Sequence, residues 1–374
     1  MKRVLLVDLN NCMYYLYHAK VPQKSWSFLS ALRDLAKQFD IDRVVITGEG
    51  VGGSSYRLAL YPEYKWERKK RRKEAPPEEQ ERIREFLTEE VEFFVDLARL
   101  VGLPVLRVKG AEADDVISYL VNKLNLEEYR LLILSTDSDL NQLLRPGVVQ
   151  AGDASMHGAI SGGDHIPGKA WLNSATFTDQ HGITPEQYVL VKSLSGDTSD
   201  SIPSPGGLGD TIALRLIQSY GDLETLESKL EECTFLKQVY ADGGYKLITA
   251  ALEEGTDSAL VEKYGPLKKF KKDLKAGTDV LPIERMKVNA KEALVNGGMD
   301  MVRRNLKLVN LSHDDATFRE VLGEEGVQFM DSAIEMLGVP HRPNREALSE
   351  LMLEHGKVGT VANLDFWLSP FTKP

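Results

Sequence analysis

Cysteine is scarce in this chain, which has only Cys12 and Cys233 among its 374 residues. Two widely separated cysteines exclude a disulfide framework and a cysteine-based metal site, and they are typical of a reducing compartment. Apolar runs of about 18 residues are also missing, which excludes a membrane-spanning helix. The short apolar run at the start reaches an acid at Asp8 and lacks a small-residue cleavage site. It therefore predicts a buried strand rather than a signal peptide, and we expect a cytoplasmic protein.

An excess of positive charge is missing too, because 56 acidic and 46 basic residues give a net charge of -10. Taken alone, this sum argues against a polyanionic partner. However, the basic residues are clustered, and dissolved salt screens charged patches from one another when they are more than roughly 10 Å apart, so the local charge matters more than the net charge. Seven of them lie between Lys65 and Lys73, and five between Lys268 and Lys275. Such clusters, in a chain that also has short acidic motifs, fit a protein that binds metal ions and phosphates next to each other.

Short apolar runs alternate with helical patterns in the first part of the chain. Arg3–Asp8, Arg43–Gly48 and Arg130–Asp137 are rich in Val, Leu and Ile without polar alternation, which predicts buried strands. The helical patterns that separate them span residues 25–38, 78–101 and 113–124. This order predicts an α/β fold with a central, mainly parallel sheet flanked by helices.

The later part of the chain has a different pattern. Residues 152–169 are rich in Gly, Ser and Asp, which predicts a loop or a β-hairpin. After Pro185, short helices with Gly and Pro punctuation continue to about Asn310. We therefore expect an α/β domain over residues 1–185, a helical module over 186–310 and a C-terminal helical extension over 311–374.

Nine acidic residues stand where the predicted strands and helices end or begin. They are Asp8, Glu49, Glu112, Asp114, Asp115, Asp137, Asp139, Asp197 and Asp200. Ligands bind beyond the carboxyl ends of the strands in open α/β sheets, and carboxylates about 4 Å apart repel each other unless cations lie between them. Ligand sets made only of oxygen favour Mg²⁺ or Mn²⁺ over zinc. Two such ions could activate a water and stabilise the leaving oxygen of a phosphodiester.

Together the motifs resemble the 5′→3′ exonuclease/flap endonuclease family, which includes the nuclease domain of bacterial DNA polymerase I and stand-alone phage enzymes. The resemblance covers about residues 1–310 in order. It rests on the Asp8 strand, Tyr56-Arg57, Tyr61-Pro62-Glu63-Tyr64-Lys65 with Arg68, Gly110–Asp115, Ser135–Asp139, Lys192–Pro203 and Gly206-Gly207-Leu208-Gly209. It implies a PIN/5′-nuclease-like fold with a helical arch over residues 64–85 and a helix-hairpin-helix-like element that binds duplex DNA.

The resemblance also implies roles for individual residues. The nine acids correspond to the metal-binding carboxylates, with Glu49 where the family has Asp and with Asp197 and Asp200 serving a second metal. Lys65 and Arg68 match the residues that contact the scissile phosphodiester and are the catalytic candidates. The candidate DNA-binding residues are Arg57, Tyr64, Trp66, Lys69, Lys70, Arg71, Arg72, Gly207, Gly209 and Thr211. The glycine-rich element can also hold a K⁺ ion, although Asp210-Thr211 replaces the usual Lys there.

These expectations describe a free-standing, monomeric, structure-selective 5′-nuclease that cuts DNA at 5′ ends, flaps, nicks and single-strand/duplex junctions. Two Mg²⁺ ions would serve it, with Mn²⁺ as a substitute, and its place would be in replication, where flaps or RNA primers on DNA are removed. A PIN-type ribonuclease and a non-catalytic junction-binding protein are the alternatives. The apolar stretch Val361–Phe371 either docks on its own core or binds a replication partner such as a sliding clamp or a single-strand-binding protein.

Overall fold

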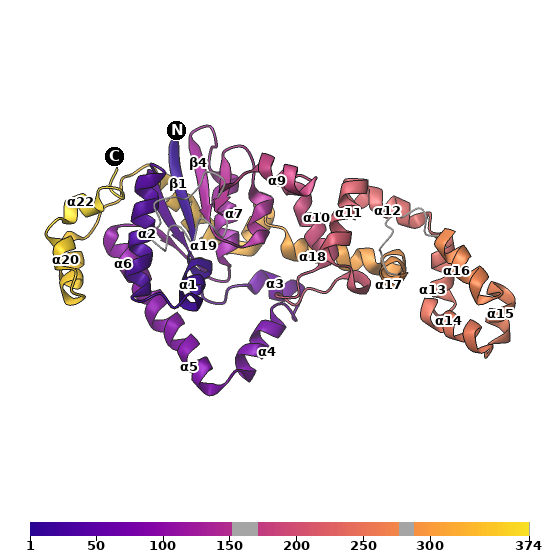
Figure 1. Cartoon of the computed structure of the whole chain (residues 1–374). Helices are drawn as coiled ribbons and strands as arrows, with labels where there is room; N and C mark the ends of the chain where they lie inside the picture. The colour runs from indigo at the N-terminus through magenta and orange to yellow at the C-terminus, as the bar shows by residue number, and fades with distance from the viewer. Residues whose placement is uncertain (152–170, 277–287, 374) are drawn as a thin grey trace. The chain divides into compact units, whose positions relative to one another are not determined.

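The computed structural model describes residues 1–151, 171–276 and 288–373 (Figure 1). The loop or hairpin expected over 152–169 lies outside these residues. Contacts divide the chain into two compact units. The first unit comprises Met1–Ala59, Lys70–Gln180 and Leu311–Pro374, and the second comprises Leu60–Lys69 and His181–Asn310. Residues 311–374, expected as an extension, thus lie in the first unit.

The first unit is built on one sheet, which has six strands in the described part of the chain, in the order β3-β2-β1-β4-β5-β6. The strands are β1 (Lys2–Asp8), β2 (Arg43–Thr47), β3 (Val105–Leu106), β4 (Tyr129–Leu134), β5 (Val148–Ala151) and β6 (Trp171–Leu172). Every pairing is parallel except that of β5 with the short edge strand β6. This arrangement confirms the predicted α/β fold with a mainly parallel sheet.

Helices cover both faces of this sheet (Figure 1). The helices that lie wholly or partly in the first unit are α1 (Leu9–His18), α2 (Lys24–Gln38), α3 (Ser55–Leu60), α4 (Trp66–Glu74), α5 (Pro77–Glu85), α6 (Val91–Val101), α7 (Ala113–Lys123), α9 (Ser174–His181), α19 (Asp315–Met336), α20 (Arg345–Glu354), α21 (Val358–Val361) and α22 (Leu364–Leu368). The helical pattern predicted over 78–101 is formed by α5 and α6, joined by the π-helical turn η1 (Phe86–Glu90). Three of these helices, α3, α4 and α9, have residues in the second unit as well.

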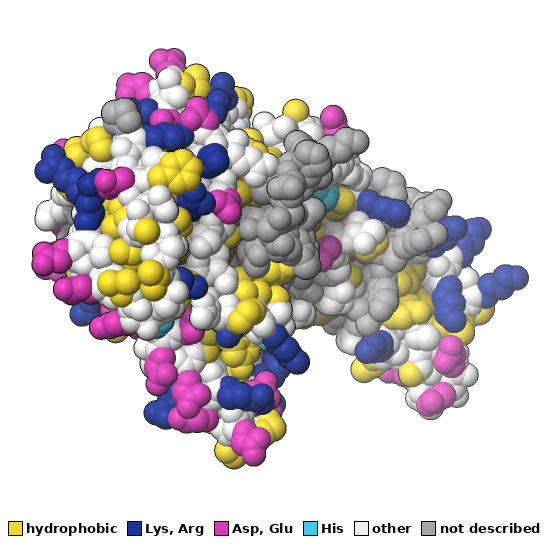
Figure 2. Space-filling view, turned by 60° about the vertical axis from the view of Figure 1, so that its left-hand side comes forward, with side chains coloured by type: hydrophobic (Ala, Val, Ile, Leu, Met, Phe, Trp, Pro, Cys, Tyr) yellow, Lys and Arg dark blue, Asp and Glu magenta, His cyan; other side chains and the backbone are white. Residues whose placement is uncertain are grey.

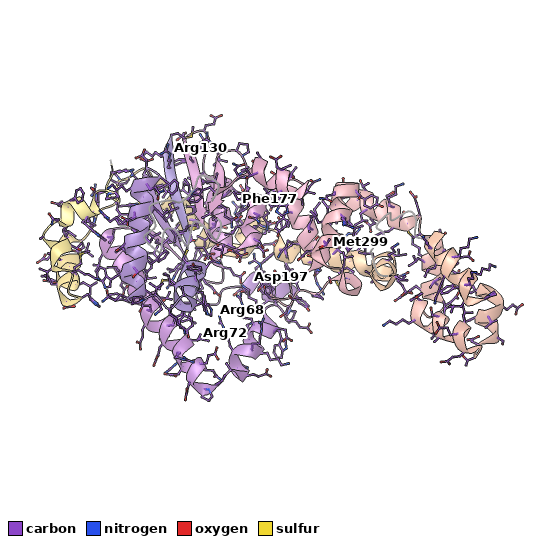
Figure 3. All side chains as sticks on the ribbon, in the orientation of Figure 1. Arg68, Arg72, Arg130, Phe177, Asp197 and Met299 are labelled. Carbon is purple, nitrogen blue, oxygen red and sulfur yellow. The ribbon has the colours of Figure 1, made fainter. Side chains whose placement is uncertain are left out.

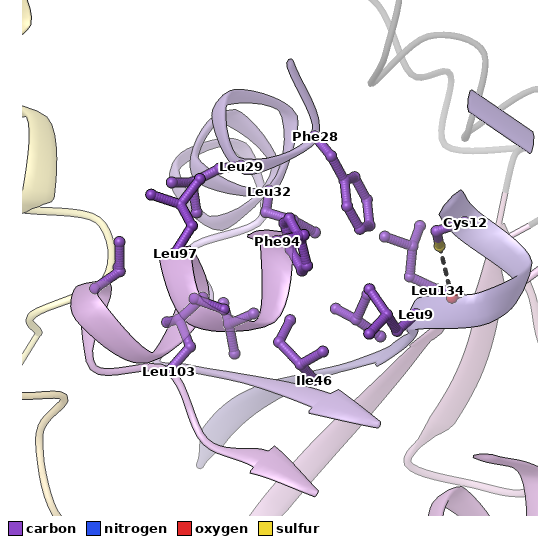
Figure 4. Packing of buried hydrophobic residues seen from close by; sticks show 14 of the residues in the cluster. Leu9, Cys12, Phe28, Leu29, Leu32, Ile46, Phe94, Leu97, Leu103 and Leu134 are labelled. Atoms are coloured by element: carbon purple, nitrogen blue, oxygen red, sulfur yellow. Dashed lines mark hydrogen bonds between the residues drawn. The ribbon is translucent and has the colours of Figure 1, made fainter. Parts of the chain in front are cut away.

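The core lies in two layers, one on each face of the sheet. Because successive side chains of a strand point to opposite faces, Leu5 and Val7 of β1 join one layer, whereas Val4 and Leu6 join the other. On the first face α2 and α6 interdigitate over β2, as the rings and leucines in Figure 4 show. On the second face α7 and α19 pack together. Buried layers on both faces explain why the strands read as continuous apolar runs.

The C-terminal residues contribute to both layers. Phe318 and Met330 of α19 are buried on the second face, and Leu348 of α20 is buried on the first. The tail ends there as well, because Leu368 and Phe371 are 0% and 1% exposed within the first layer. For these side chains, docking on the chain's own core is therefore the observed outcome.

The second unit is helical throughout its described residues. Its elements are α10 (Pro185–Ser195), η4 (Pro205–Gly207), α11 (Asp210–Tyr220), α12 (Leu223–Glu231), α13 (Thr234–Ala241), α14 (Tyr245–Glu254), α15 (Ser258–Tyr264), α16 (Leu267–Ala276), α17 (Val288–Ala293), η5 (Leu294–Gly298) and α18 (Met299–Val309). Helix α10 packs on α11 and α18, and α13–α16 enclose an aromatic cluster around Phe270. No described helix is long and apolar enough to cross a membrane.

Candidate active site

Asp8 is the last residue of β1 and the N-cap of α1, so its place is fixed by the strand-to-helix turn. One carboxylate oxygen accepts the backbone N–H of Asn11 at 3.1 Å, and the other accepts the hydroxyl of Ser135 at 2.9 Å. The side chain is only 4% exposed. Burying a carboxylate is unfavourable without such donors, so these two hydrogen bonds stabilise Asp8 in its place at the carboxyl edge of the sheet.

The loop after β4 is joined to the same place. The Ser135 hydroxyl oxygen that serves Asp8 also accepts the backbone N–H of Asp137 at 3.1 Å. Asp137 caps the 3₁₀ turn η2 (Ser138–Leu143) and accepts the N–H of Asp139 at 2.9 Å. From the other side, the amide of Gln150 donates to the carbonyl of Asp137 at 2.6 Å. The structure thus links Asp8 with Asp137 and Asp139, as predicted for strands that end at one edge.

A buried cation separates the next two acids. Arg57 donates to both carboxylate oxygens of Asp115 at 2.9 and 2.8 Å and lies 3.2 Å from Glu112. The three side chains are nearly inaccessible, at 5%, 1% and 7% exposure for Arg57, Asp115 and Glu112. Glu112 and Asp115 also form a capping box at the start of α7, and Ser54 donates its hydroxyl to Glu112. The sequence placed Arg57 among the DNA-binding residues, but the structure gives it these two carboxylates as partners.

Asp114 and Glu49 are less enclosed than their neighbours. Asp114 lies in the first turn of α7 and is half-buried. Glu49 is exposed in the turn after β2, where its backbone N–H points to the amide oxygen of Asn10 at 3.4 Å. Its side chain lies against Gly53, because a Cβ on that glycine would come within 2.5 Å of it. Glu49 therefore stands at the carboxyl edge, with its side chain over the loop that leads to α3.

In the second unit the structure brings Lys65 and Asp200 together across a long sequence separation. The backbone N–H of Lys65 donates to the carbonyl of Asp200 at 2.8 Å, and its ammonium lies 4.0 Å from that carboxylate. Both side chains are less than one fifth exposed, at 18% and 17%. The hydroxyl of Tyr64 donates to Asp200 at 2.9 Å, and Tyr64 itself is 3% exposed. Tyr64, expected to stack on a base, is thus a buried support for Asp200.

Asp197 organises the loop that contains Asp200. Its carboxylate accepts the backbone N–H groups of Ser199 and Asp200 and the hydroxyl of Ser199, and Lys192 donates to it at 3.0 Å. Burial alone would raise the pKa of Asp197, but the charge of Lys192 and the hydrogen bonds from Ser199 and Lys192 outweigh it, so the pKa is lowered. An isolated antiparallel β-bridge between Asp197 and Ile202 closes this loop through backbone hydrogen bonds in both directions.

The segment expected as an arch consists of two short polar helices, α4 and α5, with no buried residue in either. Pro77 is the first residue of α5, where a proline needs no hydrogen-bond donor. Gln80 donates to the carbonyls of Lys73 and Ala75 and so closes the corner between the helices. Trp66 is 55% exposed. The remaining basic candidates, of which Figure 3 labels two on α4, are exposed: Arg68, Lys69, Lys70, Arg71 and Arg72.

The glycine-rich turn before α11 leaves open space beside its backbone. Gly207 has a φ of +75°, a conformation that favours glycine, and a Cβ placed there or on Gly209 would meet nothing within 4 Å. Gly209 caps α11 without any side-chain hydrogen bond, and Thr211 in the first turn is exposed. A phosphate can approach N–H groups at such a helix end, although Asp210 places a negative charge in the same turn.

The donors at the sheet edge decide which metal the site suits. In the described ranges no three His, Cys, Asp or Glu side chains converge closely enough to hold a metal ion as they stand. The acids offer carboxylate oxygens, which fit a hard cation such as Mg²⁺ or Mn²⁺. Arg57 already neutralises part of the charge of Glu112 and Asp115. The residues therefore suit divalent cations by the chemistry of their oxygen atoms. Of the acids that are not ion-paired to Arg57, Asp8 is the most enclosed.

Sequence reasoning did not assign several supporting residues. Ser135 and Asn11 join β4 to α1, because Asn11 accepts the backbone N–H of Thr136 at 3.0 Å. Ser54 and Gln150 support Glu112 and Asp137. A local signal existed for Asn11, which follows Asp8 closely, and for Ser135, which belongs to the Ser135–Asp139 motif. None existed for Gln150, whose role depends on pairing between strands.

Comparison with known proteins gives matches at three levels. Residues 3–161 match the model of the 5′-3′ exonuclease, N-terminal resolvase-like domain. A thermostable DNA polymerase I of Thermus thermophilus is 32% identical over 239 residues, which are 62% of this chain but 25% of that protein. A 5′-3′ exonuclease of Halalkalibacterium halodurans is 29% identical over 255 residues, 68% of this chain and 72% of that protein. The chain thus spans about a quarter of the length of the polymerases that it matches.

Solved structures show the same fold. T5 5′-exonuclease with bound divalent metal ions (zinc) superposes with a TM-score of 0.64 at 19% identity, covering 90% of this chain and 100% of that one. The bacteriophage T5 flap endonuclease in a pseudo-enzyme-product complex with DNA and metal ions gives the same TM-score and coverage. These likenesses bear on the fold, and with the sequence matches they confirm the resemblance that the motifs predicted.

Proposed function

Because residues 3–161 match the model of the 5′-3′ exonuclease, N-terminal resolvase-like domain, we propose that the chain is a structure-selective 5′-nuclease of the 5′→3′ exonuclease/flap endonuclease family. It hydrolyses DNA phosphodiesters at or near 5′ ends, flaps and single-strand/duplex junctions. The observation that carries this proposal is two linked sets of acids: Asp8 shares a hydroxyl with the Asp137 loop, and Glu112 and Asp115 share a buried arginine. Binding DNA alone does not need such a concentration of negative charge.

Two divalent cations complete the site in this proposal, Mg²⁺ first and Mn²⁺ as its substitute. Neighbouring T5 structures described as containing metal ions support it. When bound, such ions supply an activated water and stabilise the leaving oxygen. Asp8, Glu49, Glu112, Asp114, Asp115, Asp137 and Asp139 are the proposed ligands in the first unit, and Asp197 and Asp200 are those in the second. Arg57 limits repulsion between Glu112 and Asp115.

Lys65 is the proposed stabiliser of charge at the scissile phosphate. Its backbone is fixed by Asp200, and its side chain is partly enclosed, so the ammonium is held in place before the substrate arrives. Charge developing on phosphate oxygens is stabilised best by such a fixed cation. Arg68, one turn further along on α4, is the second catalytic candidate.

The other cations of α4 would bind phosphates of the strand that passes the arch. Lys69, Lys70, Arg71 and Arg72 are exposed there, and Trp66 offers a surface on which a base can stack. In the second unit the proposed duplex contact is the helix-hairpin-helix-like turn. Gly207 and Gly209 admit a phosphate next to Thr211, and backbone carbonyls of this turn would hold a K⁺ ion.

A role in flap or RNA-primer removal during replication is supported by the polymerase I relatives. A partner, such as a sliding clamp or a single-strand-binding protein, would bind the part of the C-terminal tail that stays exposed. Phe366 is 70% exposed beside a pocket of about 250 Å³ lined by Arg33, Lys37, Asp40 and Lys373 among others. Phe366→Ala should abolish stimulation by such a partner without changing the melting temperature; unchanged stimulation contradicts this assignment.

A cleavage assay separates this proposal from the two alternatives. The wild-type protein is given a 5′-flap DNA, a matched single strand and a matched RNA hairpin, each with Mg²⁺ and with EDTA. We expect cleavage of the flap at the junction only when Mg²⁺ is present. Flap binding without cleavage would indicate a junction-binding protein, and preferential cleavage of the RNA would indicate a PIN-type ribonuclease.

A further inference from the structure

Helix α16 has two faces of opposite character. Phe270 and Leu274 are 0% and 4% exposed, and the ring of Phe270 packs against the rings of Tyr245 and Tyr264. The lysines Lys268, Lys271, Lys272 and Lys275 are all exposed. They follow the spacing i, i+3, i+4, i+7, which places them in one stripe along the helix. Packing of the apolar face therefore fixes the direction in which the lysine stripe points.

The charge of this helix stands out against the rest of the chain. Leu267–Ala276 contains five lysines and one aspartate, which is a net charge of +4 within a protein of net charge -10. Lys271 lies 3.8 Å from Glu253, but both side chains are about half exposed, and exposed ion pairs of this kind contribute little. Figure 2 shows Lys and Arg side chains in groups on the visible surface rather than spread evenly over it. The ion pair with Glu253 therefore does not cancel the positive charge of the stripe.

The composition of the stripe indicates what it binds. Among its described side chains, α16 exposes lysines and carries its aromatic residue on the buried face, so it offers no platform for stacking bases and no apolar wedge for a lipid surface. From Lys268 to Lys275 the helix rises about 10 Å, and phosphates of one strand in a duplex follow each other every 3.4 Å or so along the axis. The stripe thus matches about three phosphates.

We infer that α16 is a second DNA-contact surface, which binds the phosphate backbone of double-stranded DNA regardless of sequence. This inference rests on the proposed function and specifies the substrate class, namely DNA with a duplex arm. Four lysines on a fixed helix present a regular row of charges to a regular row of phosphates. A single strand has no such regular row and offers bases that this face does not engage.

The test is equilibrium binding in EDTA to a closed circular duplex and to a single-stranded circle, over a series of salt concentrations. The variant carries Lys268→Gln, Lys271→Gln, Lys272→Gln and Lys275→Gln. Its control removes four exposed cations of the first unit by Lys20→Gln, Arg99→Gln, Arg130→Gln and Arg319→Gln, which changes net charge equally. We expect the α16 variant to bind the duplex about 10- to 100-fold more weakly, with a salt slope flatter by about 3, and the control to change far less.

An unchanged salt slope, or equal losses in the variant and the control, overturns the inference. If the α16 variant loses equal affinity for the duplex and for the single strand, the inference that the stripe binds double-stranded DNA is wrong. A variant with four Lys→Arg changes at the same positions keeps the charge and must keep the slope, whether or not the glutamine variant folds well. Because EDTA prevents metal-dependent cleavage, the binding result is independent of catalysis. Failure of the proposed nuclease would show instead as wild-type protein that does not cut with Mg²⁺.

Discussion

The acids at the sheet edge and the cations of α4 are held in place by different means. Arg57, Glu112 and Asp115 are enclosed, with side-chain exposures of 7% or less. Helix α4 has no buried residue, and its basic side chains face solvent. Packing and buried hydrogen bonds thus position the enclosed residues. The basic side chains of α4 are suited to a negatively charged partner by their charge and exposure. Mutations in the two regions should therefore remove different quantities: folding stability and chemistry in one, and binding in the other.

The largest effect on stability should come from Arg57→Ala. Removing this guanidinium leaves Glu112 and Asp115 buried without their cation, which destabilises a protein by about 3–5 kcal/mol. Urea unfolding followed by circular dichroism measures the change. On α4 the matched change Lys70→Ala should stay within about 0.5 kcal/mol, because Lys70 is exposed. Similar losses in both variants would erase the distinction between the two regions.

An intermediate effect is expected for Lys65, which is partly enclosed and directly precedes the exposed cations of α4. Lys65→Ala should slow the chemical step by roughly 10²-fold, because a fixed cation next to the reacting phosphate is lost. Lys70→Ala should leave that step unchanged and instead lower the salt slope of binding by about one phosphate contact. Single-turnover cleavage at several salt concentrations separates rate from affinity. Equal rate losses in the two variants would mean that Lys65 is merely another binding cation.

The smallest predicted effect is the pH dependence of folding stability that arises from the buried side chain of His341 in the first unit. His341 accepts the backbone N–H of Val44 at 3.1 Å, and its burial, with Arg43 nearby, lowers its pKa to about 4. The folded state therefore resists protonation, so stability is fully present above the unfolded pKa near 6.5 and is lost as pH falls towards 4. Between about pH 7 and pH 5.5 we expect a loss of roughly 1 kcal/mol from this group.

His341→Gln keeps a hydrogen-bond acceptor and cannot titrate, so its unfolding free energy should depend less steeply on pH than that of the wild type. Parallel pH profiles for wild type and His341→Gln would contradict the assignment.

The sequence was informative where a motif is local and less so where packing decides. The strands and the acids that follow them could be predicted because each depends on neighbouring residues. Arg57 and Tyr64 were predicted to bind DNA because the family resemblance implies that role for them. Their actual partners, Asp115 and Asp200, come from distant positions that a single sequence cannot connect.

The edge strand β6 and the hydrogen bonds of Gln150 were missed for the same reason. A two-residue strand has no periodicity of its own, and it forms only because β5 offers an unpaired edge. The tail was left open between two outcomes, since burial of Leu368 and Phe371 depends on a surface formed by other parts of the first unit.

The central claim is that the carboxylates at the sheet edge bind the divalent ions that cleave DNA. Its most direct test measures Mn²⁺ binding and flap cleavage together, in the wild type and in the double variant Asp137→Asn with Asp139→Asn. We expect the variant to bind fewer ions, to cut at no more than a few per cent of the wild-type rate, and to bind a flap substrate as tightly as the wild type does. A variant that retains both Mn²⁺ stoichiometry and cleavage would contradict the claim.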